Sequence, residues 1–112
     1  MPGAQPYSAA LLAQLRAQHR PVFIDLTAAW CITCQVNERT TLEAAPVRDL
    51  FKDKHVALLV GDWTNRDPAI TALLTASHRA GVPLYLYYPP GGAAAILPQI
   101  LTPGIVKAAL QG

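Results

Sequence analysis

The spacing of apolar residues changes along the chain between helix-like and strand-like periods. In residues 7–19, leucines three and four positions apart alternate with polar side chains. This predicts an amphipathic helix with Ser8 as its N-cap and Pro21 beyond its end. Apolar runs bounded by polar segments predict three buried strands, at 22–26, 56–60 and 84–88. Asp25 interrupts the first of these runs with a carboxyl group.

Two further helical segments lie between these strands. One extends over 34–44 and resumes over 47–52, with Pro46 interrupting or kinking it. The other covers 67–80, with Asp-Pro at its first positions and Gly81 as the residue that ends it.

A weak strand and a last helix complete the predicted order. Residues 95–101 form a short strand that Pro98 restricts to a sheet edge, and Thr102 caps a helix over 103–110. The order α-β-α-β-α-β-β-α predicts a single α/β domain over 1–112, with a central mixed sheet of about four strands flanked by helices. Four aromatic residues are interpreted as packing residues: Trp63, Tyr85, Tyr87 and Tyr88.

Composition narrows the possible partners. The chain is 52% hydrophobic and 14% charged, which is sufficient for a buried core. A net charge of +2 without blocks of like charge argues against nucleic acid or an anionic membrane as the main partner. No apolar run approaches the roughly 18 residues of a membrane span.

The candidate chemistry lies at Cys31 and Cys34, between a buried strand and the start of a helix. Free backbone N–H groups and the helix dipole favour a thiolate on Cys31, while Cys34 lies one turn further in and is more shielded. We therefore expect Cys31 to attack and Cys34 to resolve the mixed disulfide. The redox-active disulfide then needs no diffusible cofactor. A metal-binding module is the alternative, although two cysteines supply only half of the ligands of a structural zinc site.

The segment 25–34, followed by Gly81-Val82-Pro83, resembles the thioredoxin superfamily over nearly the whole chain. The resemblance is strongest to the C-terminal periplasmic domain of the membrane reductase DsbD and its relatives, including the ScsB type, of which the stretch 62–68 is also characteristic. Classical thioredoxins have Gly-Pro between the cysteines, where this chain has Ile-Thr at 32–33.

The resemblance implies roles for four residues around the cysteines. Asp25 is expected to be a buried acid that exchanges a proton with the resolving thiol, and Glu38 to lie near it. The peptide bond before Pro83 is expected to be cis, with the backbone of Val82 available to an extended substrate. Trp30 is expected at the rim of the site. Each role has a purely structural alternative. Asp25 would be a carboxylate bonded to backbone, Glu38 a solvated glutamate, Pro83 a turn proline and Trp30 a core aromatic residue.

Two acids and no histidine between the cysteines favour a reductant. By resemblance, the domain passes two electrons from a membrane-embedded partner domain to oxidised periplasmic proteins, as a periplasmic part of a larger inner-membrane protein. The alternative within the same class is a stand-alone cytoplasmic thioredoxin reduced by a soluble reductase. The metal-binding module, with Cys31 and Cys34 as soft ligands for Cu(I) or Zn(II), belongs to another class.

Overall fold

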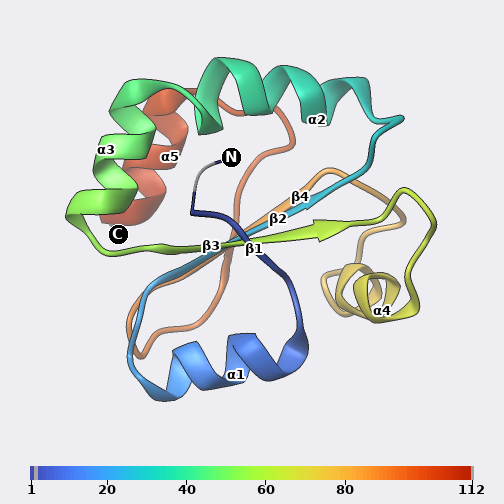
Figure 1. Ribbon diagram of the computed structural model, residues 1–112, viewed down its shortest axis with the longest axis horizontal. Helices are drawn as coiled ribbons and strands as arrows, with labels where there is room; N and C mark the ends of the chain where they lie inside the picture. The colour runs from blue at the N-terminus through green and yellow to red at the C-terminus, as the bar shows by residue number, and fades with distance from the viewer. Residues whose placement is uncertain (2, 112) are drawn as a thin grey trace.

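The computed structural model describes residues 1 and 3–111, and it has the predicted α/β architecture with a mixed sheet (Figure 1). The elements in chain order are β1 (Gln5–Pro6), α1 (Ala9–Ala17), β2 (Val22–Thr27), α2 (Ile32–Asn37), the π-helical turn η1 (Glu38–Leu42), α3 (Ala45–Asp53), β3 (Ala57–Asp62), α4 (Pro68–Ala76), β4 (Leu84–Tyr88), β5 (Ala95–Ile96) and α5 (Pro103–Gln111). None of the helices described is long and apolar enough to cross a bilayer.

The sheet has five strands in the order β1-β3-β2-β4-β5, so the expected number of about four was too low. The additional strand β1 is two residues long, and its Pro6 would not be expected inside a strand from sequence. Strands β1, β3 and β2 run parallel, whereas β4 and β5 are antiparallel to their neighbours. Strand β5 is also shorter than predicted, because only Ala95–Ile96 pair with β4.

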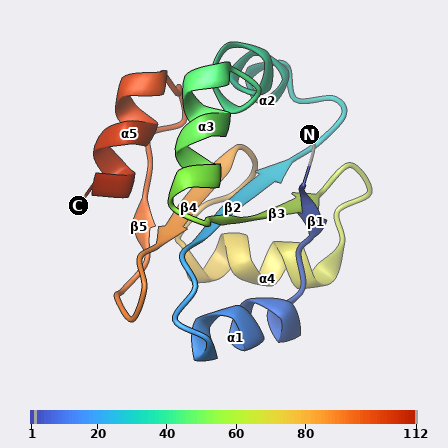
Figure 2. The ribbon, with the colours of Figure 1, turned by 60° about the vertical axis from the view of Figure 1, so that its left-hand side comes forward.

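Helices cover both faces of the sheet. Figures 1 and 2 show α2, α3 and α5 on one face, with α1 and α4 on the other. Because side chains alternate along a strand, Ile24 and Leu26 of β2 pack on the α1/α4 side, and Phe23 packs against α3 and α5. Asp25 lies on the same face as Phe23, so its carboxyl group is placed beneath the helices that follow the cysteines.

The end of helix α4 differs from the prediction. The helix ends at Ala76 rather than near residue 80, and His78 rather than Gly81 adopts the left-handed conformation that closes it, with φ of 60°. The N–H of His78 donates to the carbonyl of Thr75 at 3.0 Å. The expectation of Gly81 failed because a histidine can occupy this conformation when the closing hydrogen bonds are made.

A histidine in the left-handed conformation ends two more helices. His19 follows α1 and His55 follows α3, with φ of 57° and 59° respectively. The N–H of each donates back into the last turn of its helix. All three histidines of the sequence therefore have a structural position at a helix end.

The helical segment after the cysteines is divided differently from the prediction. Helix α2 ends at Asn37, the turn η1 follows with wider winding, and Pro46 lies in the first turn of α3 rather than interrupting a helix. Proline is well tolerated at that position because the first N–H groups of a helix have no partner within it. Wider turns of this kind are often found near functional sites.

Candidate active site

The two cysteines form a disulfide at the start of α2. Their Cα atoms are 5.3 Å apart, and Cys31 is the N-cap residue of the helix. Its Sγ accepts a hydrogen bond from the backbone N–H of Cys34 at 3.2 Å. Cys31 is 7% exposed and Cys34 is 2% exposed. The helix N-terminus therefore acts on the sulfur that is more accessible, which suits an attacking thiolate.

Asp25 lies in β2 and is almost completely buried. Its Oδ1 accepts no hydrogen bond from any part of the chain that the structure describes. Burial and, as the smaller cause, the negative charge of Glu38 together raise the pKa of Asp25 from its ordinary 3.8 to about 7. A carboxyl group of this kind is close to half-ionised at neutral pH, so it can both accept and release a proton.

Glu38 is the first residue of η1 and is partly exposed. It lies close enough to the sheet for its charge to act on Asp25 and on Tyr85 of β4. The structure thus brings both predicted acids to the face of the sheet that α2 covers. The charges of the two carboxylates oppose ionisation of a nearby thiol.

Trp30 lies at the rim of the site and is half-exposed. Its indole Nε1 donates to the carbonyl of Thr64 at 3.1 Å, and the Thr64 Oγ1 accepts from the N–H of Ala29 at 2.9 Å. The Trp63 ring is 5.9 Å from the Trp30 ring, and the guanidinium of Arg66 lies over both rings. The loop between β3 and α4 therefore fixes the orientation of Trp30 and of the segment before Cys31.

Val82 and Pro83 lie on another side of the disulfide. Val82 packs against the cluster formed by Ala28, Cys31 and Cys34. The Val82–Pro83 peptide bond is cis, as the resemblance implied. The ladder between β2 and β4 begins at Leu84, so the backbone of Val82 lies outside it.

Four residues near the site were not singled out for function from the sequence. Asn37 is buried three positions after Cys34 and bonds to the hydroxyl of Tyr85. Thr64 holds the segment around Trp30, and Thr27 has a buried Oγ1 without a hydrogen-bond partner among the described residues. The signal for Asn37 was its position on the same helix face as Cys34, where an apolar residue is usual.

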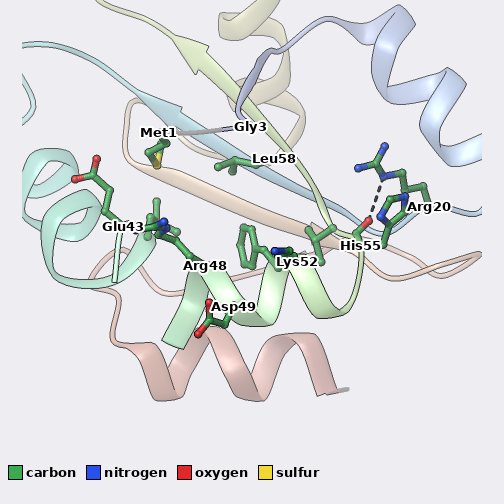
Figure 3. A pocket seen from close by; sticks show the side chains of 12 residues that line it. Met1, Gly3, Arg20, Glu43, Arg48, Asp49, Lys52, His55 and Leu58 are labelled. Carbon is green, nitrogen blue, oxygen red and sulfur yellow. Dashed lines mark hydrogen bonds between the residues drawn. The ribbon is translucent and has the colours of Figure 1, made fainter. Parts of the chain in front are cut away.

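A cavity of about 430 Å³ lies away from the cysteines (Figure 3). Its basic lining residues are Arg20, Arg48, Lys52 and His55. The Arg20 Nε donates to the carbonyl of His55 at 3.1 Å. The cavity contains none of the predicted site residues, so it is separate from the redox centre. Within residues 1 and 3–111, no group of three or more His, Cys, Asp or Glu side chains is arranged to hold a metal ion.

The arrangement supports one kind of chemistry. An accessible sulfur at a helix N-terminus is paired with a shielded sulfur, and an acid that exchanges protons near neutral pH lies beneath that helix. Fold and site together define a thiol–disulfide oxidoreductase domain. A family model described as thioredoxin-like matches residues 4–90, and the chain belongs to that family.

The curated relatives are thiol:disulfide interchange proteins. The chain is 37% identical over 83 residues to DsbD 1 of Pseudomonas aeruginosa, covering 74% of this chain and 14% of that protein. It is 32% identical over 76 residues to DsbD of Escherichia coli K12, covering 68% of this chain and 13% of that protein. The chain thus spans only about an eighth of the length of these relatives.

A solved structure shows the same fold over the whole domain. The C-terminal domain of DsbD from Neisseria meningitidis, in its oxidised form, superposes with a TM-score of 0.74 at 23% identity. The match covers 95% of this chain and 96% of that one.

Proposed function

We propose that this domain is a periplasmic reductant of the DsbD type. It receives two electrons from a membrane-embedded partner domain and passes them to oxidised periplasmic proteins. The similarity to DsbD proteins supports this route. The chain matches only a small part of those proteins, so other parts of such a protein could supply the electrons. The same similarity supports the proposed periplasmic location and the proposed membrane-bound donor.

Electron transfer takes place in two exchange steps. The Cys31 thiolate attacks the disulfide of the acceptor, which forms a mixed disulfide and releases one acceptor thiolate. Asp25 then accepts the proton of the Cys34 thiol, and the Cys34 thiolate attacks the sulfur of Cys31. The second acceptor thiolate leaves, the Cys31–Cys34 disulfide forms, and the acceptor has gained two electrons. The proton held by Asp25 passes to solvent or to the released thiolate.

The observation that carries this proposal is the buried carboxyl group of Asp25, with Glu38 acting on it. Strongly oxidising exchange proteins depend on a stabilised reduced form, in which a thiolate is favoured. Here one carboxyl group comes from β2 and one from η1, and the negative charge of both disfavours thiolate formation. The reduced form is therefore not specially stabilised, and it gives up its electrons readily.

Partner proteins dock around the accessible sulfur. Trp30 and Ile32, the chain neighbours of Cys31, expose large apolar side chains, and so does Val36 further along the same helical segment. The free backbone of Val82 can pair with an extended segment of the partner.

Equilibration of the domain against glutathione buffers measures its reduction potential. We expect a value near that of thioredoxin, about −270 mV. A value near about −120 mV, typical of a strong periplasmic oxidant, would contradict the proposal.

A second assay compares electron donors for the oxidised domain. The membrane-embedded domain of a DsbD protein is expected to reduce it faster than thioredoxin reductase with NADPH. Faster reduction by the soluble reductase would instead support a stand-alone thioredoxin.

The role of Asp25 is tested on the resolving step. The reduced domain reacts with an aromatic disulfide, and Cys34 releases the second coloured thiolate when it resolves the mixed disulfide. We expect Asp25→Asn to slow the second release at neutral pH. Asp49→Asn removes an exposed carboxylate of α3 and is the control. Equal rates in Asp25→Asn and the wild type would show that Asp25 takes no proton.

A further inference from the structure

Asn37 is a buried polar residue with an unusually complete set of hydrogen bonds. It is 1% exposed. Its Nδ2 donates to the hydroxyl of Tyr85 at 2.9 Å and to the carbonyl of Gln99 at 2.7 Å, and its Oδ1 accepts from the N–H of Leu101 at 3.0 Å. These bonds use both N–H groups of the amide, so its orientation is fixed. They connect α2 with β4 and with the segment before α5.

These contacts connect the helix that carries Cys34 with the strand that pairs with Asp25. Asn37 follows Cys34 by three positions, so both side chains lie on the same side of α2. Tyr85 is paired with Asp25 in the antiparallel ladder of β2 and β4. Residues directly opposite in such a ladder point to the same face of the sheet. The Tyr85 hydroxyl thus lies on the face of the sheet from which Asp25 projects.

The hydrogen-bonding capacity of the two groups is complementary. The Tyr85 hydroxyl accepts a hydrogen bond from Asn37, so its own proton is still to be donated. Asp25 Oδ1 is a buried acceptor without a donor among the residues described. Burial, followed by the charges of Asp25 and Glu38, raises the pKa of Tyr85, while the hydrogen bond from Asn37 acts in the opposite direction. The phenol therefore remains protonated. It makes no hydrogen bond to Asp25 among the described contacts, so the two groups interact through the O–H dipole and the carboxylate charge across the same face of the sheet.

We propose that Asn37 and Tyr85 are positioning residues for proton transfer at this site. Asn37 fixes the Tyr85 hydroxyl, and the hydroxyl stabilises the carboxylate form of Asp25. Asp25 thereby stays able to accept the proton of Cys34. This inference rests on the role proposed above for Asp25.

Other groups also act on Asp25 and are held constant in the test. Glu38 acts on it from η1. When the disulfide is reduced, the thiols of Cys31 and Cys34 at the start of α2 are two further titratable groups on this face of the sheet. Strand β3 places the apolar Val60 beside Asp25 in register.

The variant Tyr85→Phe tests the inference with little risk to folding. It keeps the ring, which packs 6.2 Å from the ring of Phe23, and removes only the hydroxyl. The pKa of Asp25 is measured by carboxyl-carbon NMR in the oxidised domain. The resolving rate is measured by reacting the reduced domain with the aromatic disulfide. We expect the pKa of Asp25 to rise above about 7. A rise of about one pH unit lowers the ionised fraction at pH 7, and with it the resolving rate, about fivefold.

Tyr87→Phe is the matched control. Tyr87 is buried on the same face of the same strand, but it is paired with Phe23 instead of Asp25. Its loss should leave both the pKa of Asp25 and the resolving rate at wild-type values. Equal effects of Tyr85→Phe and Tyr87→Phe would overturn the inference, because they would reflect the loss of any buried hydroxyl.

Double variants separate this inference from the proposed function. In the Asp25→Asn background, Tyr85→Phe should have no further effect on the resolving rate, and an undiminished effect would overturn the inference. If Asp25→Asn slows the resolving step and Tyr85→Phe changes neither measurement, the inference fails and the role of Asp25 stands. If Asp25→Asn resolves the mixed disulfide at the wild-type rate, both the proposed role of Asp25 and this inference fail. Adding Asn37→Ala to Tyr85→Phe should not raise the pKa of Asp25 further, and a further rise would show that Asn37 acts independently.

Discussion

The buried carboxyl group of Asp25 should make the stability of the oxidised domain depend on pH in an unusual direction. Most carboxyl groups in folded proteins have a pKa at or below the ordinary value for the free side chain. Their ionisation therefore keeps or increases the free energy of unfolding as pH rises. Asp25 is buried with Oδ1 unpartnered among the described residues, and its pKa lies near 7 instead of 3.8. Removing its charge with Asp25→Asn, at nearly constant size, should abolish this contribution.

The sign and size follow from the two pKa values. Below pH 3.8, Asp25 is protonated in both the folded and the unfolded chain. Between pH 3.8 and about 7, the unfolded chain releases this proton and the folded chain keeps it, so the free energy of unfolding falls as pH rises. Above about pH 7 the contribution is constant. At about 1.4 kcal/mol for each pH unit, the total loss is about 4 kcal/mol, of which about 3 kcal/mol falls between pH 5 and pH 8.

Urea unfolding of the oxidised wild type and of Asp25→Asn, from pH 5 to pH 8, measures this contribution. The oxidised form is used because its cysteines do not titrate. The stability of Asp25→Asn relative to the wild type should increase by about 3 kcal/mol over this range. Asp49→Asn, which removes an exposed carboxylate, should show a constant difference. If the difference for Asp25→Asn were also constant, the raised pKa and the reasoning from burial would be refuted.

Three further changes have defined outcomes. Glu38→Gln should lower the pKa of Asp25 without restoring its ordinary value, because burial is the larger cause, and NMR titration of the oxidised domain checks this. Thr64→Val removes the hydroxyl that donates to Asp62, so the pKa of Asp62 should rise toward its ordinary value, with about 1 kcal/mol of stability lost in urea unfolding. His78→Gly should raise the free energy of unfolding by about 1 kcal/mol, because glycine adopts positive φ without a steric cost, whereas His78→Ala should not.

The main helices and strands of the fold were predictable because each buries a continuous face. The continuous apolar run at 22–26 marks a strand buried on both faces, and the leucine spacing of α1 marks the side of the helix that meets the core. Strand β1 was missed and β5 was predicted too long, because a strand of two residues is too short to show a hydrophobic period. The end of α4 was misplaced because His78 closes the helix through backbone hydrogen bonds, which a search for glycine does not detect.

The site was predictable where its chemistry is local in sequence. Cys31 and Cys34 lie at the N-terminus of one helix, and Asp25 precedes them on the adjoining strand. The contact between Asn37 and Tyr85 joins residues 48 positions apart and depends on how α2 crosses β4, so no local pattern shows it. The sequence placed Tyr85 correctly in a buried strand but could not show what its hydroxyl meets.

The placement of Asp25 connects the stability of the domain with its proposed role as a reductant. The charge that destabilises the folded chain above neutral pH is the same charge that disfavours a thiolate and that, in the proposed mechanism, accepts the proton of Cys34. On the other side of the disulfide, the helix N-terminus and the N–H of Cys34 favour negative charge on Cys31. The two sulfurs thus experience opposite influences, which supports the proposed attack by Cys31 and proton release by Cys34. A variant that gains stability by losing this carboxyl group should therefore lose resolving rate in the same pH range, since both effects arise from one ionisation.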